Sequence, residues 1–434
     1  MRVLFVSGEL IAGDLPWRLS LEGCDVKLFV EHPAQQECQA GFVTKIDDWR
    51  SELGWVGKTG LIVFDDVGYG GIQDSLRGEG YRVFGGSEGG DRLELDRVFA
   101  QNTLGALGLE VLPTYRFGSP AETAQHIRNS KPCRWVVKQN NHDSAICYVG
   151  IFEDGSDVIG VLEAYQASGI TDVCLQKAVT GIEFGVGRFF NGKDWVGPIE
   201  LNIEHEPLCD GDIGPKTGEM GTLAWYSDDE RQPLFQKVLA PLKPILQAND
   251  FRGDVDINCI VNEKRVVPLE ITARLGSPTV HVQQALHRTP LCEFLGAIAD
   301  GRQISLEYRR EYGVGVAVVV PPYPYTGRLD GHHTAKGFPV QFVSEPSQEE
   351  RLRHYHFESV RREVNSNDCE RLLITNGIAY AAIVTGTGET VAAARESVYS
   401  AVRNLCIPKA IYRTDIGKKF IETDADKLRA WGWI

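Results

Sequence analysis

Several large classes of protein are excluded by what the sequence lacks. No apolar run approaches the roughly 20 residues that a membrane span requires, and the longest candidate, residues 314–320, has the length of a strand and ends at Pro321. The N-terminus has no basic stretch ahead of its apolar residues and no small-residue cleavage site behind them, so we expect a first strand and no signal peptide. The net charge of −14 disfavours nucleic acid or an anionic membrane as the main partner.

Two common functional signatures are also missing. The ten cysteines are scattered, and no two of them form a CxxC pair, which argues against a zinc ribbon or a disulfide framework. We expect reduced thiols in a cytoplasmic protein. No GxGxxG follows the first apolar run, where Gly8 and Gly13 are the only early glycines, so a dehydrogenase gains little support. The chain has neither an internal repeat nor a low-complexity tract.

The length and composition indicate a globular protein of several domains. A chain of 434 residues is too long for one ordinary core, so two to four domains are expected. Hydrophobic residues make up 43% and charged residues 24%, the balance of a soluble protein. Short β-prone runs alternate with helix-sized stretches near the N-terminus, which predicts a parallel α/β sheet whose strand ends bind ligands; the runs are residues 2–6, 25–30, 60–64 and 81–84.

The pattern changes after about residue 94 and again near residue 311. An amphipathic helix is predicted over residues 94–107, and a second over 233–248 should be kinked or split by Pro241 and Pro244. Between and after them, runs separated by Gly- and Asp-rich turns predict antiparallel strands; they are residues 134–138, 173–177, 184–190, 195–201, 255–261 and 265–272. A helix is expected over 290–300. The last region has predicted strands at 313–320, 371–375 and 379–385 and a helix at 390–405.

The hairpin over residues 255–272 carries the first candidate site. Asp256 and Glu270 lie on its two strands, and we expect the strands to set the two carboxylates side by side. Two carboxylates that face one pocket form a hard-oxygen site suited to Mg²⁺ that bridges nucleotide phosphates. Arg274 lies four residues beyond Glu270 and could neutralise a transferring phosphate. Solvated charges on an ordinary antiparallel pair are the alternative, with equal weight on the pattern alone.

Three further segments carry candidate ligand contacts. Residues 210–221 hold four glycines and a proline, which indicates a shaped loop, neither helix nor strand, that lets backbone N–H groups approach an anion. A plain surface turn is the alternative. Lys138 ends a short apolar strand and could meet a phosphate, although a lysine that protects a sheet edge is equally plausible. Residues 175–183 combine a strand, a bend and Glu183. The bend could pair with an adenine edge and Glu183 could accept ribose hydroxyls, or the segment could be a strand end with a solvated acid.

In this order, the segments resemble the ATP-grasp superfamily and, within it, the glycinamide ribonucleotide synthetases (phosphoribosylamine–glycine ligases). Residues 214–221, GPKTGEMG, are similar to the family loop GPNTGGMG, and residues 412–417 match its closing YRTDIG. Residues 376–380 and 386–390 resemble the strand and turn before that motif. The resemblance covers essentially the whole chain; the two loops are specific, whereas the strand motifs occur throughout the superfamily.

The resemblance implies a fold and a chemistry. The fold class is α/β plus α+β: an N-terminal Rossmann-like domain (1–93), an ATP-grasp domain (94–310) with a mobile subdomain at about 120–190, and a small C-terminal domain (311–434). ATP would phosphorylate a small-molecule carboxylate, glycine or another amino acid, and an amine would attack the acyl phosphate to give an amide. The implied cofactors are ATP and Mg²⁺, with Mn²⁺ as an alternative. A cytoplasmic monomer or homodimer is expected.

Residue roles follow from the resemblance position by position. The metal ligands would be Asp256, Glu270 and Thr272. The nucleotide contacts would be Arg97 at the start of the nucleotide domain, Lys138 on the α/β phosphates, Gln176 and Lys177 at the adenine, and Glu183 at the ribose. The catalytic residues would be Arg274 near the transferred phosphoryl group and Lys216 and Thr217 in the loop that shapes the acyl-phosphate pocket.

The sequence departs from the family at four places that contact substrate or phosphate. The N-terminal motif GGREHA, associated with phosphoribosylamine, is replaced by residues 7–14, which carry two acids. The loop at 139–144 lacks the usual glycines and second lysine. The family's metal-binding asparagine is Thr272, and an acidic pair is replaced by Ser277 and Thr279. Three interpretations stay open: the family's own reaction, a ligase with another amine or acid, and a nucleotide-binding protein with little or no turnover.

Overall fold

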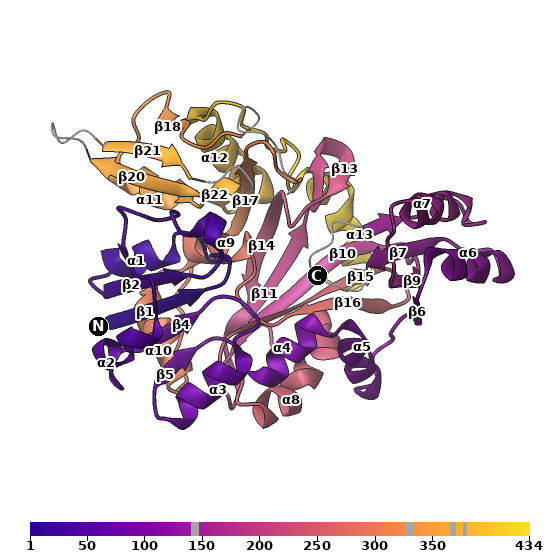
Figure 1. The fold of residues 1–434 in the computed structure, drawn as a ribbon, viewed down its shortest axis with the longest axis horizontal. Helices are drawn as coiled ribbons and strands as arrows, with labels where there is room; N and C mark the ends of the chain where they lie inside the picture. Colours follow the sequence, from indigo (N-terminus) through magenta and orange to yellow (C-terminus); the bar gives the residue numbers. More distant parts are fainter. Residues whose placement is uncertain (140–146, 326–333, 365–369, 376–379) are drawn as a thin grey trace.

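The computed structural model describes residues 1–139, 147–325, 334–364, 370–375 and 380–434, and Figure 1 shows its arrangement. A parallel sheet lies at one end of the long axis, and a small layer of strands and helices lies at the other. A large antiparallel sheet runs between them. In this view β18 (Pro339–Phe342), β20 (Val360–Val364), β21 (Glu370–Ile374) and α12 (Val391–Asn404) lie above it, and the C-terminus lies near its middle.

The N-terminal unit is the predicted parallel α/β sheet. Its strand order is β3-β2-β1-β4-β5, and the paired strands run parallel. Alternate residues of β1 enter two different apolar clusters, one on each face of the sheet. Burial on both faces explains why these strands are continuous apolar runs. The elements are β1 (Arg2–Ser7), α1 (Leu15–Leu21), β2 (Asp25–Val30), β3 (Thr44–Lys45), α2 (Leu53–Val56), β4 (Leu61–Phe64), α3 (Gly70–Gly78) and β5 (Arg82–Phe84).

A small antiparallel sheet forms the layer at the far end. Its order is β6-β9-β7-β8, and α6 and α7 pack against one face through a common apolar cluster. The elements are β6 (Thr114–Phe117), α6 (Pro120–Asn129), β7 (Trp135–Gln139), β8 (Cys147–Val149), α7 (Ser156–Ala167) and β9 (Val173–Lys177).

The large sheet has eight antiparallel strands in the order β16-β15-β10-β11-β14-β17-β22-β19. It is continuous across residues 310 and 311, where the sequence suggested a domain boundary, because β14 pairs with β17. Residues 182–190 belong to this sheet rather than to the small one. Its strands are β10 (Ile182–Phe190), β11 (Trp195–Glu204), β14 (Gly221–Ser227), β15 (Asp254–Val261), β16 (Val266–Thr272), β17 (Tyr312–Val319), β19 (Tyr355–Phe357) and β22 (Tyr380–Gly388).

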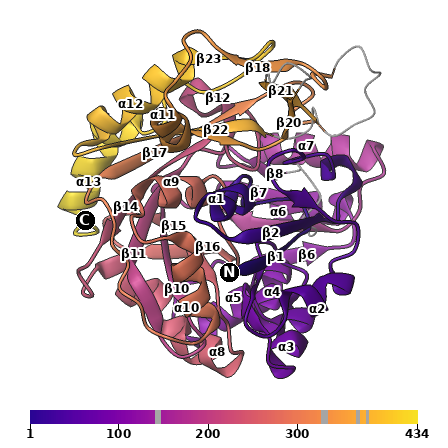
Figure 2. The same cartoon turned by 90° about the vertical axis from the view of Figure 1, so that its left-hand side faces the viewer.

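Helices and a second small sheet complete the C-terminal half. Helix α9 (Thr279–Leu286) packs against β14, β17 and β22, and Figures 1 and 2 both place it between α1 and β17. The remaining elements are α10 (Leu291–Ala299), β18 (Pro339–Phe342), α11 (Gln348–His354), β20 (Val360–Val364), β21 (Glu370–Ile374), α12 (Val391–Asn404), β23 (Leu405–Cys406) and α13 (Ala425–Ala430). The predicted helices at 290–300 and 390–405 are therefore confirmed.

Two predicted helices differ from the structure for local reasons. The helix expected over residues 94–107 is two helices, α4 (Glu88–Leu95) and α5 (Arg97–Ala106). Asp96 breaks it, because its side chain accepts a hydrogen bond from the Phe99 backbone and starts a new helix. Residues 235–248 form three successive helical turns of different pitch, ending in α8 (Lys243–Ala248), as expected from Pro241 and Pro244.

None of the helices in the described ranges combines the length and apolar character needed to cross a bilayer.

Candidate functional site

The hairpin of β15 and β16 places the predicted carboxylates on one face, but not directly opposite each other. Asp256 pairs in register with Thr272, and Asn258 pairs with Glu270. A bulge follows Asn258 in this ladder. The expectation of two carboxylates side by side is therefore corrected: Asp256 and Glu270 are diagonal neighbours, and the partner that faces Asp256 is Thr272. All three offer oxygen atoms, the ligands that Mg²⁺ prefers.

A row of buried polar residues extends this face across β11, and the sequence analysis missed it. The Asn202 side-chain amide donates to Glu200 Oε2 at 3.1 Å and to Asp256 Oδ2 at 3.0 Å. The Asn258 amide donates to Glu183 Oε1 at 2.7 Å and to Glu204 Oε2 at 2.8 Å. A signal was present, because polar residues alternate with apolar ones in residues 200–204 and 254–258, as they do on one face of a strand.

Two glycines of β10 make room for this polar row. A Cβ atom on Gly185 would lie 2.1 Å from Asn202 Oδ1, and a Cβ atom on Gly187 would lie 3.0 Å from both Asp256 Oδ2 and Glu200 Oε2. Larger residues at these positions would displace the side chains that cross the strand. The glycines of β10 are therefore part of the site, although they carry no functional group.

The row concentrates carboxylates in a poorly hydrated space. Burial, reinforced by Asp254, raises the pKa of Asp256 to about 7. Burial and the neighbouring acids also raise the pKa values of Glu200, Glu204 and Glu219 well above their usual range. The oxygens Asn202 Oδ1, Asn258 Oδ1, Glu200 Oε1 and Glu219 Oε1 are buried with no hydrogen-bond partner among the described residues. Such a face is stabilised by a cation.

Two arginines border the hairpin. Arg97 Nη2 lies 3.6 Å from Glu270 Oε2, which places the first residue of α5 beside a predicted metal ligand. Arg274 donates from Nε to Glu94 Oε1 at 3.1 Å, and the other oxygen of Glu94 accepts from the Ala273 backbone at 2.7 Å. Burial opposes the charge of Arg274, but Glu94 outweighs it and raises the pKa of the guanidinium. Glu94 of α4 therefore orients Arg274, a role that the sequence analysis did not assign.

The small sheet presents Lys138 and Gln176 on the face opposite its helices. Val136 and Gln176 pair in register, as do Lys138 and Cys174, whereas the alternate residues of β7 and β9 pack into the cluster with α6 and α7. The Gln176 amide donates to Thr114 Oγ1 at 2.6 Å. Lys177 is the next residue of the strand and therefore points to the other face. The two residues predicted at the adenine thus do not share a face.

Glu183 of the large sheet interacts electrostatically with Lys138 of the small sheet. Burial and Glu206 raise its pKa to about 7, while the charges of Lys216 and Lys138 act in the opposite direction. Lys216 forms an ion pair with Glu206, and Glu183, Glu206 and Lys216 line a common cavity of about 190 Å³. The predicted ribose contact and the predicted acyl-phosphate contact therefore share one cavity.

The glycine-rich segment 210–221 is a hairpin arm rather than a loop free of strands. Residues 213–216 form β13 (Ile213–Lys216), which pairs with β12 (Pro207–Cys209). The expectation of neither helix nor strand was wrong here because the preceding backbone supplies pairing partners. Thr217 closes the arm by donating to the Glu206 carbonyl at 2.6 Å, so its hydroxyl is engaged with backbone in this conformation.

The C-terminal motif at 412–417 braces this arm. Arg413 is 1% exposed and contacts Asp212 at 2.9 Å, Asp415 at 2.8 Å and the Pro207 carbonyl at 3.0 Å. The Thr414 backbone donates to Asp210 at 2.7 Å. The two motifs that carried the resemblance are therefore one structural unit. Residues 140–146 and 376–379, which include most of the loop after Lys138 and part of the third motif, lie outside the described residues.

The N-terminal segment that replaces GGREHA is acidic in the structure as well. Asp14 is fully buried and contacts Arg18 and His356, while Glu9 is exposed. Asp65 and Asp66 follow β4 at the same edge of the parallel sheet. Burial, together with the charge of Asp66, raises the pKa of Asp65 to about 7. This edge therefore offers carboxylates where a phosphate group would require cations.

Comparisons with known proteins agree with this arrangement. No family model matches the chain. The phosphoribosylamine–glycine ligase of Streptomyces coelicolor is 27% identical over 357 residues, covering 80% of this chain and 81% of the relative. That of Corynebacterium ammoniagenes is 25% identical over 361 residues, covering 80% and 79%.

Solved structures extend the similarity over nearly the whole chain. Phosphoribosylamine–glycine ligase from Thermotoga maritima superimposes with a TM-score of 0.69 at 20% identity, covering 96% of this chain and all of the other. An L-amino acid ligase from Bacillus licheniformis superimposes with a TM-score of 0.58 at 11% identity, covering 94% and 98%. The chain thus has the ATP-grasp fold, and it resembles the phosphoribosylamine–glycine ligases in sequence and in structure.

Proposed function

We propose that the protein is an ATP-dependent carboxylate–amine ligase that works through an acyl phosphate and accepts an amine without a phosphate group. The observation that carries the ligase assignment is the oxygen-lined face of β15 and β16, which Arg97 borders. The charge of Lys138 acts on Glu183 of the neighbouring strand β10. The protein's similarity to known ligases supports the same chemistry.

The hairpin fits a hard divalent cation. Asp256 and Glu270 supply carboxylates, and Thr272 supplies a hydroxyl opposite Asp256. Asn258 pairs in register with Glu270, and its side-chain oxygen Oδ1 has no hydrogen-bond partner among the described residues. When Mg²⁺ or Mn²⁺ is bound with ATP, it supplies positive charge to the phosphates. Thr272 is a weaker ligand than the amide carbonyl of an asparagine, so we expect looser metal binding than the same hairpin would have with asparagine.

Of the remaining side chains, some would bind the nucleotide and others would act on the carboxylate that is phosphorylated. Lys138 and Arg97 bring positive charge from the small sheet and from α5 to the phosphates, which a carboxylate-lined face would otherwise repel. Gln176 and Glu183 are left to position the base and the ribose. Arg274, oriented by Glu94, is suited to offset the charge that develops when the terminal phosphoryl group moves to the carboxylate.

Lys216 and Lys419 both line the cavity that holds Glu183, and Lys216 lies in the arm whose sequence resembles the family's acyl-phosphate loop. Burial opposes the charge of Lys216, but Glu206 and Glu183 raise its pKa, so it stays protonated and can hold an anionic carboxylate. The arm that carries it is fixed by Thr217 and by Arg413. Once the carboxylate is phosphorylated, its carbon becomes electrophilic and phosphate is the leaving group when the amine attacks.

The acidic edge of the parallel sheet supports the amine assignment. Residues 7–14 carry two acids where the family motif has an arginine and a histidine. Glu9 is exposed at this edge and Asp66 is partly exposed, whereas Asp14 is buried and pairs with Arg18. Carboxylates attract an ammonium group and repel a phosphate. The acceptor is therefore an amine that carries positive charge, such as an amino acid or a polyamine.

ADP release in the presence of ATP, Mg²⁺ and a panel of amines and carboxylates tests the proposal. We expect ADP and a new amide, identified by mass spectrometry, only when both an amine and an acid are present. ATP binding with no product across the panel would indicate a nucleotide-binding protein without turnover. Glycinamide ribonucleotide as the preferred product would leave the ligase assignment intact but refute the phosphate-free amine.

A further inference from the structure

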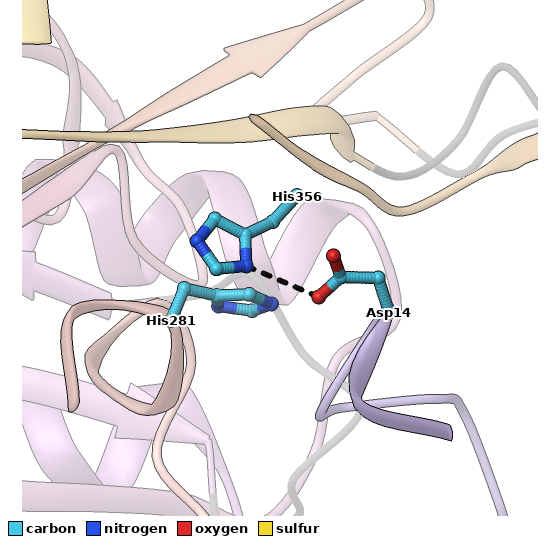
Figure 3. A group of neighbouring side chains, drawn as sticks. All are labelled: Asp14, His281 and His356. Atoms are coloured by element: carbon cyan, nitrogen blue, oxygen red, sulfur yellow. Dashed lines mark hydrogen bonds and ion pairs between the residues drawn. The ribbon is translucent and has the colours of Figure 1, made fainter. Parts of the chain in front are cut away.

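A second group of buried polar side chains lies away from the nucleotide hairpin, where three distant parts of the chain meet. Asp14 directly precedes α1, His281 lies on α9, and His356 lies on β19. All three side chains are fully buried, and one ligand atom from each lies within 4.8 Å of the others. Figure 3 shows the Asp14 carboxylate and the two imidazole rings converging on one space.

Hydrogen bonds fix the outer nitrogen of each imidazole. His281 Nδ1 lies 3.3 Å from the Pro278 carbonyl, which can only accept, so Nδ1 carries the proton. His356 Nε2 lies 3.2 Å from Thr385 Oγ1, and that hydroxyl already donates its proton to the Arg353 carbonyl at 3.0 Å. His356 Nε2 must therefore be the donor. When both imidazoles are neutral, the inner nitrogens His281 Nε2 and His356 Nδ1 therefore carry no proton and each presents a lone pair.

Each bare nitrogen faces a carboxylate oxygen rather than a hydrogen donor. His356 Nδ1 lies 3.1 Å from Asp14 Oδ1, and His281 Nε2 lies 2.6 Å from Glu358 Oε1. Neither atom of the second pair has a hydrogen-bond partner among the described residues, and both are buried. Two acceptors held this close without a proton between them repel each other unless a cation lies between them.

We propose that Asp14, His281, His356 and Glu358 form a closed binding site for one divalent transition-metal ion, with zinc as the best fit. Two imidazole nitrogens and carboxylate oxygens are an established zinc donor set. Ligands about 2.1 Å from a tetrahedral ion lie about 3.4 Å apart. The Asp14, His281 and His356 atoms, which lie within 4.8 Å of one another, would move inward onto the ion, and the 2.6 Å His281–Glu358 pair would open to admit it. The site differs from the nucleotide hairpin in position and in its nitrogen ligands.

The surroundings have the features of a metal site's supporting contacts. Each histidine donates its outer N–H to a backbone carbonyl or a hydroxyl, the arrangement that orients metal-bound imidazoles. Asp14 Oδ2 accepts from Arg18 Nε at 2.7 Å, and Arg18 also donates to the Leu352 carbonyl at 2.7 Å. Gly13 has a φ of +52°, and a Cβ atom there would lie 1.9 Å from Glu358 Oε1. A glycine is therefore required for the Glu358 carboxylate to take its place.

Closure and burial indicate a structural role. The four donors come from three segments, and one ion would join the parallel sheet, α9 and the end of the large sheet. Because the donors are buried, an ion here should exchange slowly and leave no open position for a substrate. This inference does not depend on the proposed ligase reaction, since it concerns the joining of these segments.

Metal analysis of the purified full-length protein tests the site. After chelation and reloading with zinc alone, we expect about one tightly held zinc per chain. The double variant His281→Gln/His356→Gln should lose that zinc, whereas His32→Gln, at an exposed histidine, should keep it. Glu270→Gln should also keep it, which separates this site from the hairpin.

Cobalt provides a second readout that does not depend on stability. Cobalt-loaded wild-type protein should show the visible absorption of a nitrogen-ligated tetrahedral ion, and the single variants His281→Gln and His356→Gln should each weaken it. If the wild type retains neither zinc nor cobalt after gel filtration, the proposal is wrong. Retention that is unchanged in the double variant would place the metal elsewhere and would equally overturn it.

Discussion

The β15–β16 hairpin, called here the nucleotide hairpin, and the buried cluster of Asp14, His281, His356 and Glu358, called here the junction, both contain carboxylates. The two sites differ in how far these carboxylates are exposed to solvent. The Glu270 side chain is 44% exposed and Arg97 is 28% exposed, whereas Asp14, His281 and His356 are fully buried. Oxygen ligands that reach solvent can release and rebind a hydrated cation with each nucleotide. Buried nitrogen and oxygen ligands instead hold what they bind. We therefore expect changes at the hairpin to reduce activity and changes at the junction to reduce stability.

The largest effect is expected from Glu270→Gln. Removing one carboxylate charge from the phosphate-facing site should lower amine-dependent ADP release by about 1,000-fold, equal to about 4 kcal/mol in the barrier. The thermal midpoint should stay close to that of the wild type, because the Glu270 side chain is 44% exposed and reaches solvent. Glu263→Gln, in the turn of the same hairpin, is the matched control and should keep full activity. A large loss of stability in Glu270→Gln would remove the contrast between the regions.

A smaller effect, on stability rather than on activity, is expected from His356→Ala. The change removes the buried imidazole that contacts Asp14 Oδ1 and Thr385 Oγ1, and it should lower the free energy of unfolding by about 3 kcal/mol. Denaturant unfolding followed by intrinsic fluorescence measures it, with His32→Gln as the exposed control. Unchanged stability together with lost ligase activity would show that the junction serves the chemistry instead.

Gly13→Ala tests the packing of the junction without removing a donor. The new methyl group would meet Glu358 at a left-handed backbone position, so we expect a loss of about 2 kcal/mol in unfolding free energy. Gly23→Ala is the matched control, because Gly23 also has a positive φ but nothing lies within 4 Å of its added Cβ atom. Equal losses in the two variants would mean that backbone strain alone, not the approach of Glu358, explains the effect.

The smallest effect is a gain at the hairpin from Thr272→Asn. An amide carbonyl opposite Asp256 is a better magnesium ligand than a hydroxyl, so half-maximal activity should need about fivefold less Mg²⁺, equal to about 1 kcal/mol. Thr272→Val removes the oxygen and should shift the requirement in the other direction. A Mg²⁺ requirement that is the same in all three proteins would show that position 272 does not reach the metal.

Much of the fold was predictable because its signals are local. The parallel strands are apolar on both faces, and the antiparallel hairpin alternates around one turn, so periodicity alone located both. The break at Asp96 was missed because a single capping hydrogen bond outweighs an otherwise helical pattern. The pairing of residues 213–216 with 207–209 was missed because glycine content signals a turn but does not show which backbone lies beside it.

The candidate site was predictable only in part. Sequence similarity supplied the identities of Asp256, Glu270 and Thr272, but the register that makes Thr272 the neighbour of Asp256 depends on the bulge after Asn258. The buried residues Glu200 and Asn202 alternate along β11, yet their meeting with Asp256 depends on two glycines in the strand between them. Such contacts are set by which strands become neighbours, and that order is not encoded in any single strand.

By itself, the sequence determined the α/β beginning, the antiparallel hairpin and the resemblance that predicted an ATP-grasp ligase, because these depend on residues close together in the chain. Only the tertiary structure brought Asp14, His281 and His356 together, since Asp14 and His281 are 267 positions apart (281 − 14), His281 and His356 are 75 positions apart (356 − 281), and each is, alone, an ordinary polar residue. Their chemistry arises from packing: the apolar surroundings that bury them also remove the water that would otherwise satisfy their lone pairs.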